Sequence, residues 1–173
     1  MVSGSRNKKI LGNDVAGEIV EVGKEVTKYK VGDKVFGFGH SVSAEYSKSS
    51  EKALVLMPST LSYEEGASIG FGGITSLSFL RAKANIQSGQ RVLINGASGG
   101  VGVIAVQLAK HFGAEVTGVC STKNVDLVLS LGADRVIDYT KEDFTKEKEQ
   151  KYDIIFDAVG KSSFAKCRKL LTK

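Results

Sequence analysis

The chain has 173 residues, of which 42% are hydrophobic and 25% are charged, and it contains 20 glycines, one proline and no tryptophan. This balance is typical of a folded globular protein and excludes a disordered chain. No apolar run approaches the roughly 18 residues that a membrane-spanning helix needs, and the first residues lack the apolar core of a signal peptide. We therefore expect no membrane partner, and the presence of only two cysteines fits a cytoplasmic protein.

The net charge of +5 arises from lysines that are interleaved with glutamates, as in residues 146–149. Such alternation is typical of a solvated surface, whereas a nucleic-acid site needs basic residues gathered in a patch, so we expect no nucleic-acid partner. The two cysteines, Cys120 and Cys167, have neither CxxC spacing nor a histidine pattern beside them. They indicate no disulfide framework and no zinc site, and we expect both to pack in the interior.

The first third of the chain is predicted to be β-rich, because short β-branched segments alternate with glycines. Strands are predicted at residues 16–22, 34–38, 44–46 and 53–57. Ser62 and Glu65 then have the spacing of a capping box, in which the serine hydroxyl caps the N3 amide and the glutamate reaches back. We therefore place a first unit at residues 1–61 and a second unit, opening on a helix, at residues 62–173.

Beyond residue 90, apolar strand patterns alternate with helical ones. Strands are predicted at residues 91–95, 115–120, 135–137 and 152–157, and helices at 101–112, 125–131 and 163–171. Gly113 and Gly132 are placed to end the first two of these helices. The order predicts an α/β fold for the second unit, with a parallel sheet and helices on both faces.

A cluster of glycines marks the junction of the first of these strands with its helix. Backbone N–H groups at such a junction approach a pyrophosphate closely, and the helix N-terminus adds partial positive charge. Ala97, Gly99 and Gly102 occupy the three positions of the dinucleotide fingerprint, with alanine in place of its first glycine. The predicted contacts to the cofactor phosphates are Ala97, Ser98, Gly99, Gly100, Val101 and Gly102. A tight turn without any ligand is the structural alternative.

The glycine pattern of two other enzyme classes also fits this segment, but the further catalytic residues that each class needs are missing. As GxSxG, residues 96–100 would make Ser98 a hydrolase nucleophile. The only later histidine, His111, would lie about 19 Å along the emerging helix, too far to take its proton. As GxxxGxG, the segment resembles short-chain dehydrogenases, but none of the five tyrosines is followed by lysine four residues later.

Several motifs in order resemble the quinone oxidoreductase branch of the medium-chain dehydrogenase/reductase superfamily. They are RVLINGASGGVG at residues 91–102, AVQLAK at 105–110, ILGNDVAG at 10–17, VG at 22–23, VGDKV at 31–35 and FDAVG at 156–160. The resemblance implies a partial GroES-like β-rich domain followed by a Rossmann-type dinucleotide-binding domain. It also implies a small-molecule substrate and a homodimer. Family members have roughly twice this length, so we expect Met1 to be an internal position and the sheet to continue beyond Lys173.

The resemblance also implies chemistry without zinc. Where zinc-bearing members have Gly-His-Glu, this chain has Gly12, Asn13 and Asp14, and Phe71 falls where a second ligand, a cysteine, would stand. Catalytic zinc needs sulfur or imidazole ligands, so no metal is expected. The implied reaction is direct hydride transfer to a quinone or an α,β-unsaturated carbonyl.

The residues at the end of the second strand of the α/β unit indicate which cofactor is preferred. NAD-dependent proteins place a carboxylate there for the ribose 2′-hydroxyl, but residues 119–124 contain none. Ser121, Lys123 and Asn124 offer donors that suit a 2′-phosphate, so NADPH is predicted, although Lys123 could also be an ordinary surface lysine. The resemblance adds Tyr139 at the adenine end and Thr75, Val159 and Gly160 near the nicotinamide. Thr75 could instead bond its own helix.

The leading hypothesis is an NADPH-dependent oxidoreductase that reduces a quinone or an α,β-unsaturated carbonyl without zinc. No residue is assigned as a catalytic acid or base. The alternative is a truncated, non-catalytic NADPH-binding or scaffold protein derived from such an enzyme, which the short length favours.

Overall fold

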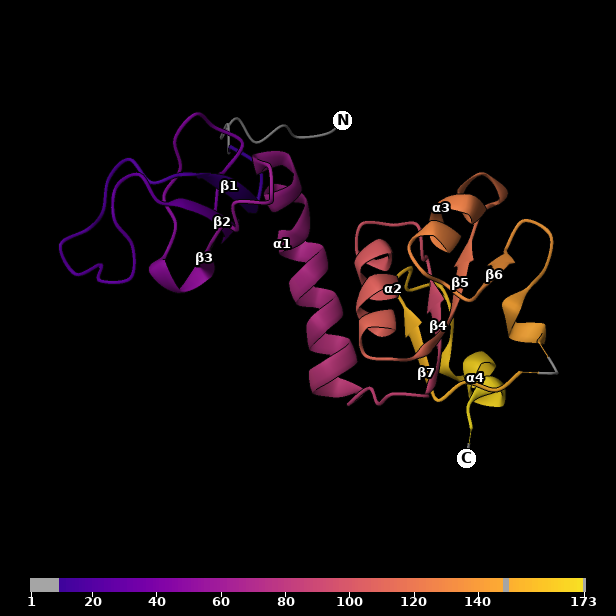
Figure 1. The fold of residues 1–173 in the computed structure, drawn as a ribbon. Helices are drawn as coiled ribbons and strands as arrows, with labels where there is room; N and C mark the ends of the chain where they lie inside the picture. Colours follow the sequence, from indigo (N-terminus) through magenta and orange to yellow (C-terminus); the bar gives the residue numbers. More distant parts are fainter. Residues whose placement is uncertain (1–9, 148–149, 173) are drawn as a thin grey trace, which may run out of the picture. The chain divides into compact units, whose positions relative to one another are not determined.

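The computed structural model describes residues 10–147 and 150–172. Met1, Lys148, Glu149 and Lys173, which entered the sequence argument, lie outside the described residues. The chain divides into two compact units, Met1–Phe71 and Gly72–Lys173. The colours of Figure 1 follow the residue numbers, so each unit can be traced there. The sequence placed the boundary at residue 61/62, where a helix starts, whereas the division by contacts falls within that helix.

The first unit contains a three-stranded antiparallel sheet in the order β1-β2-β3. Its strands are β1 (Asp14–Glu18), β2 (Lys34–Phe38) and β3 (Leu54–Leu56), with a short 3₁₀ turn at Glu51–Ala53 before the last. Val20 and Val22, predicted to continue β1, lie beyond its end and are exposed.

The strand predicted at residues 44–46 is wrong, because these residues form bends. They lie between His40 and Lys48, which form an isolated antiparallel bridge. Residues 44–46 are exposed and Tyr46 keeps 68% of its surface accessible, so the segment has no apolar face to bury against the sheet. A short β-branched or aromatic pattern does not make a strand without such a face.

Helix α1 (Tyr63–Leu77) begins at the predicted capping box. Ser62 donates its N–H to Glu65 Oε2 at 2.8 Å, and Glu65 donates its N–H to Ser62 Oγ at 3.2 Å. The reciprocal bonds satisfy two amides that the helix itself leaves unpaired. A π-helical segment, Ser78–Lys83, continues α1 and carries the fully buried Leu80.

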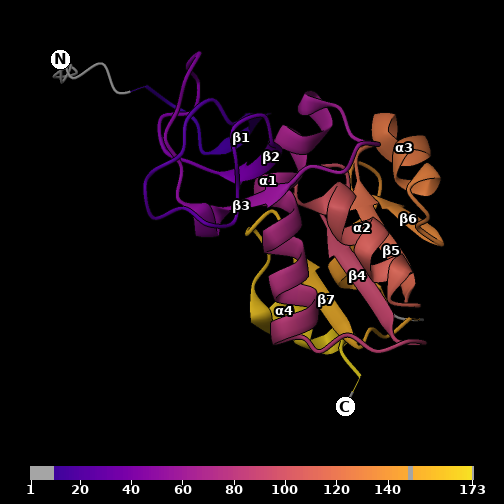
Figure 2. The ribbon, with the colours of Figure 1, turned by 60° about the vertical axis from the view of Figure 1, so that its left-hand side comes forward.

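The second unit contains a four-stranded parallel sheet in the order β6-β5-β4-β7. The strands are β4 (Arg91–Asn95), β5 (Glu115–Cys120), β6 (Arg135–Asp138) and β7 (Ile154–Asp157), and the helices are α2 (Gly102–His111), α3 (Val125–Ser130) and α4 (Phe164–Cys167). Helix α2 packs on β4 and β5, and α3 packs on β6 (Figures 1 and 2). The predicted parallel α/β architecture is confirmed.

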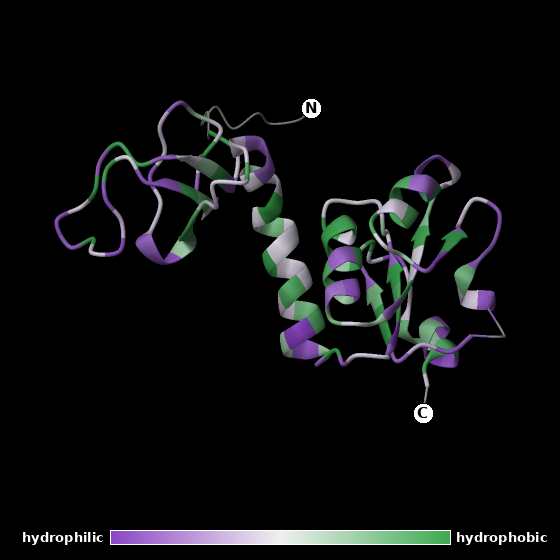
Figure 3. Cartoon of the chain, in the orientation of Figure 1, coloured by the Kyte–Doolittle hydropathy of each residue, from purple (hydrophilic) through white to green (hydrophobic). Residues whose placement is uncertain are grey.

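Alternate residues of the strands face two separate hydrophobic cores, as the period of two in a strand requires. Val92 and Ile94 belong to the core covered by α2 and α3, whereas Leu93 belongs to the core closed by Cys167 of α4 and by Leu170. Figure 3 shows the hydrophobic colouring of these central strands. Both cysteines are buried and unpaired, as predicted.

The chain passes from β4 outward to β5 and β6 and then returns to β7 on the other side of β4. This reversal makes a topological switch point between β4 and β7, and open α/β sheets bind ligands outside the carboxyl ends of the strands at such a point. Within the described residues, no helix has the length and apolar character needed to cross a membrane.

Candidate functional site

The glycine turn, residues 96–102, lies between the carboxyl end of β4 and the first turn of α2. The N–H groups of Gly96 and Ala97 donate to Val119 O at 3.1 and 2.9 Å, which fastens the start of the turn to β5. Within the described residues, no backbone acceptor receives the N–H groups of Ser98 and residues 100–102. These four amides are free to bind an anion at the N-terminus of α2.

The glycines of this turn differ in what surrounds them. A Cβ on Gly102 would lie 2.0 Å from Gly96 O, so only glycine lets α2 approach β4 so closely. A Cβ on Gly99 would meet only Gly96 O at 3.4 Å, and one on Gly100 would meet nothing within 4 Å. The open faces of Gly99 and Gly100 leave room for a ligand. Packing of the fold does not require glycine at these two positions, because the protein has space there for a side chain.

The second half of α1 packs against the same turn. A Cβ on Gly72 would lie 2.5 Å from Gly100 O, and the buried Ser76 donates its hydroxyl to Val101 O at 2.9 Å. Thr75, which precedes Ser76, is half-buried, and its hydroxyl makes no hydrogen bond within the described residues. The helical self-bond considered for Thr75 is therefore not formed, and its hydroxyl remains free for a ligand.

Asp157, at the carboxyl end of β7, organises the loop that follows it. Its Oδ1 accepts from Asn95 Nδ2 at 2.8 Å and from the N–H groups of Val159 and Gly160 at 3.1 Å each, and its Oδ2 accepts from Ser162 N at 3.0 Å. Burial raises the pKa of the Asp157 carboxyl, but these hydrogen bonds outweigh it and the net pKa is lowered. The charged carboxylate thus fixes the predicted nicotinamide contacts.

The loop after β7 lies beside the glycine turn. A Cβ on Gly96, whose φ is +84°, would approach Val159 Cγ2 to 2.7 Å, so the two segments are in contact. Val159 is 48% exposed and Gly160 has a φ of +72°. The structure therefore brings the predicted phosphate and nicotinamide contacts together at the switch point.

Asn124 connects two serines on the other side of the turn. Its Nδ2 donates to Ser98 Oγ at 3.0 Å and, at a longer 3.4 Å, to Ser121 Oγ. Because both hydroxyl oxygens act as acceptors here, each keeps its own proton to donate elsewhere. The hydrogen bond to Asn124 also occupies the Ser98 oxygen, which the hydrolase interpretation would have used as a nucleophile.

Lys123 and Tyr139 follow the ends of the neighbouring strands β5 and β6. Tyr139 donates its N–H to Cys120 O at 3.0 Å, and its side chain is 62% exposed. The Lys123 side chain is exposed and forms no hydrogen bond or ion pair with the described part of the chain. No hydrogen bond or cation–π contact joins the two side chains among the described residues, so the structure places them at one edge without assembling them into a site.

Comparison with known families gives matches along both units. The family described as alcohol dehydrogenase GroES-like domain matches residues 2–87, and the family described as zinc-binding dehydrogenase matches residues 100–173. The chain belongs to the medium-chain dehydrogenase/reductase superfamily. Its GroES-like and Rossmann-type domains occur in the predicted order.

Relatives in this superfamily include quinone and alkenal reductases. The 2-methylene-furan-3-one reductase of Solanum lycopersicum is 41% identical over 89% of this chain and 42% of its own length. The NADPH-dependent alkenal/one oxidoreductase of Arabidopsis thaliana is 38% identical over 86% of this chain and 41% of its own. The solved structure of the quinone oxidoreductase from Coxiella burnetii is 35% identical with a TM-score of 0.80, covering 87% of this chain and 49% of that one. The chain spans less than half the length of these relatives.

Within the first unit, Asp14 links the two positions, Asn13 and Phe71, that the resemblance assigns to zinc ligands. Asp14, next to Asn13, accepts the N–H of Phe71 on Oδ1 at 2.6 Å. An amide and a phenyl ring stand where imidazole and thiolate would be needed, so the donor set does not fit zinc. In the part of the chain that the structure describes, no three His, Cys, Asp or Glu residues form a group able to hold a metal ion.

Sequence reasoning missed three polar residues that hold the segments of the site in place by hydrogen bonds, namely Asn95, Asp157 and Ser76. One signal was available, because Asn95 and Asp157 each end an apolar strand at the carboxyl edge of the sheet. Nothing in the local sequence distinguishes Ser76 from any other helical serine.

Proposed function

We propose that the protein to which this chain belongs is an NADPH-dependent oxidoreductase that transfers a hydride to a quinone or an α,β-unsaturated carbonyl without zinc. The observation that carries the proposal is the carboxyl edge of β4 and β7. There the open glycines, the free amides of residues 100–102 and the loop fixed by Asp157 lie next to one another. Membership of an oxidoreductase family whose relatives reduce quinones and alkenals supports the substrate class.

In this proposal the glycine turn binds the pyrophosphate. The open faces of Gly99 and Gly100 admit the phosphates, and the free amides of residues 100–102 donate to their oxygens. The hydroxyl protons of Ser98 and Ser121 are also available, because each hydroxyl accepts from Asn124 and so keeps its own proton to donate. The arrangement supplies several backbone and hydroxyl donors and no carboxylate, which suits an anion.

The adenosine half of the site supports NADPH over NADH. No carboxylate follows β5 in residues 119–124, so the usual acceptor for a ribose 2′-hydroxyl is missing there. Within the described residues Lys123 has no hydrogen-bond or ion-pair partner, so it can pair with the 2′-phosphate, and Tyr139 follows the end of the neighbouring strand β6. A relative that is named as NADPH-dependent supports the same choice.

At the nicotinamide end, the cofactor itself supplies the hydride, and the residues of this chain position it. The Thr75 hydroxyl makes no hydrogen bond in the part of the chain that the structure describes, and the N–H groups of Val159 and Gly160 are held in place by Asp157. We assign no proton donor. With Asn13 and Phe71 at the positions of zinc ligands, elemental analysis is expected to find no stoichiometric zinc, and one tightly bound zinc per chain would overturn this part of the proposal.

Steady-state oxidation of NADPH with 1,2-naphthoquinone and with an enal tests the proposal. Saturable turnover with either acceptor is the expected result, and the Gly99→Asp variant should be inactive. NADPH binding without turnover would instead support the non-catalytic scaffold. If NADPH neither binds nor turns over, the dinucleotide site itself is refuted.

A further inference from the structure

A compact cluster of polar groups joins the segments that carry Lys123 and Tyr139. Asp138, the last residue of β6, accepts the Thr122 hydroxyl on Oδ2 at 2.5 Å and the Thr140 hydroxyl on Oδ1 at 2.7 Å. The N–H of Thr140 also donates to Oδ1 at 3.0 Å, and Lys141 Nζ lies 3.4 Å from Oδ2. One carboxylate therefore ties the turn after β5 to the turn after β6.

Every one of these donors favours the ionised form of Asp138. Hydrogen bonds from the Thr122 and Thr140 hydroxyls hold the pKa of its carboxyl well below the ordinary value, against the opposing effect of desolvation. Asp138 retains only 9% of its surface accessible. With both oxygens already bonded, this carboxylate is not available to accept a ribose 2′-hydroxyl, although it lies on the strand next to β5.

A second aspartate in the chain shows what is particular to Asp138. Asp143 Oδ1 accepts the N–H and the hydroxyl of Thr145 at 2.9 and 2.7 Å, which is the same local turn. Of these two aspartates, Asp138 alone has, within the described residues, an additional bond across to a neighbouring strand end, through Thr122. Both aspartates thus form the local turn, and Asp138 has the cross-strand bond in addition.

We propose that Asp138, held by Thr122 and Thr140, is a positioning residue that sets the preference for NADPH by keeping Lys123 and Tyr139 in register at the 2′-phosphate. This inference rests on the proposed function. Thr122 directly precedes Lys123, and Thr140 directly follows Tyr139. Fixing the two threonines therefore fixes the backbone that carries both ligand-facing side chains. It also keeps both oxygens of the Asp138 carboxylate hydrogen-bonded within the protein.

The isosteric variant Thr122→Val removes the cross-strand bond and keeps the volume. We expect it to raise the Kd for NADPH about tenfold, the scale of one hydrogen bond to a charged group, while the Kd for NADH changes less than about twofold. Thr122→Ser retains the hydroxyl and should restore the preference. Thr145→Val, which removes the matching local bond at Asp143, should leave both affinities unchanged.

Calorimetry of NADPH and NADH binding to the full chain tests this positioning role. Thermal unfolding of each variant shows whether it is folded. A folded Thr122→Val variant with unchanged NADPH affinity would overturn the inference, and so would an equal loss of both cofactors or tighter binding of NADPH. If Lys123→Ala abolishes the NADPH preference while Thr122→Val does not, the inference alone fails. If the wild-type chain shows no preference for NADPH, the proposed cofactor and this inference fail together.

Discussion

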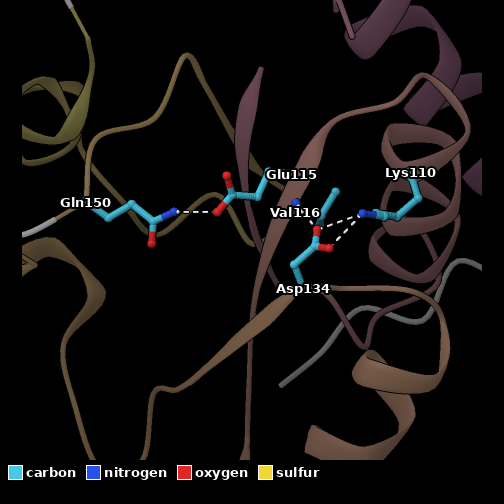
Figure 4. A network of polar contacts seen from close by, with 5 residues as sticks. All are labelled: Lys110, Glu115, Val116, Asp134 and Gln150. Carbon is cyan, nitrogen blue, oxygen red and sulfur yellow. Dashed lines mark hydrogen bonds and ion pairs between the residues drawn. The ribbon is translucent and has the colours of Figure 1, made fainter. Parts of the chain in front are cut away.

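The two edges of the parallel sheet both carry polar networks, but the networks are built differently. At the amino edge, Lys110 of α2 pairs with Asp134 at 2.8 Å, and Asp134 also accepts the N–H of Val116 at 2.7 Å (Figure 4). Gln150 donates to Glu115 at 3.1 Å beside them. The donors of Lys110, Val116 and Gln150 are all directed at carboxylates of the protein itself, and we call such a network closed.

At the carboxyl edge, by contrast, donors are left over. Asn124 donates to the hydroxyl oxygens of Ser98 and Ser121 and leaves their protons unused, and the N–H groups of Ser98 and residues 100–102 have no backbone acceptor within the described residues. The difference follows from the direction of the strands and helices. Helix N-termini with unpaired N–H groups gather at the carboxyl edge, whereas Lys110 complements the C-terminus of α2 at the other. A closed network stabilises the fold, and an open one is ready for an anion.

The sharpest test of this contrast is Gly99→Asp. The protein around Gly99 has room for a side chain, because the nearest atom to its Cβ would be Gly96 O at 3.4 Å. The fold should therefore remain, while an added carboxylate beside a pyrophosphate costs several kcal/mol and should make dinucleotide binding undetectable. Calorimetry that finds normal NADPH affinity in the folded variant would refute the phosphate site.

Gly102→Ala is the matched control in the same turn. Its Cβ would lie 2.0 Å from a backbone oxygen, so this variant should lose about 3 kcal/mol of stability or more by overpacking. Denaturant unfolding should thus separate the two glycines. Equal stabilities for both variants would show that the turn does not distinguish a packed face from an open one.

Asp157→Asn tests whether the loop after β7 depends on a charged acceptor. Asparagine retains one oxygen but presents an N–H₂ group to the remaining donors, so we expect a loss of about 3 kcal/mol in unfolding free energy. The folded pKa of Asp157 is lowered, so its stabilisation is present above the unfolded pKa of about 4 and is lost as the pH falls through the folded pKa. The difference between wild type and Asp157→Asn should shrink below about pH 4, and a difference independent of pH would contradict the role of the charge.

Lys123→Ala tests the adenosine end of the carboxyl edge. A hydrogen-bonded pair with the 2′-phosphate predicts a loss of about 1.5–3 kcal/mol for NADPH and almost none for NADH, and part of the loss should fade as salt rises. Titration of both cofactors at two salt concentrations gives the answer. Equal losses would mean that Lys123 is structural, and a wild-type preference for NADH would refute the NADPH assignment.

The sequence predicted those features whose cause is local. The capping box at Ser62 and Glu65 and the glycine turn each carry their signal within a few residues, and β5 has its bounds as predicted. The segment at residues 44–46 failed because a strand needs a partner face, which no local pattern supplies. Pairs such as Asn95 with Asp157, 62 residues apart in the chain, follow from strand order and could not be predicted before the sheet was known.

The smallest effect is expected at the amino edge, where Lys110→Met removes the ammonium of the closed network. The Lys110 and Asp134 side chains are 33% and 42% exposed, so the ion pair is screened by water and its loss should cost only about 0.5 kcal/mol. Asp134 keeps the Val116 N–H as a partner. NADPH affinity should not change, because no donor at the carboxyl edge depends on Lys110. Denaturant unfolding of this variant measures the smallest expected loss of stability, and calorimetry measures its NADPH affinity. A weakened NADPH affinity would show that the two edges are coupled.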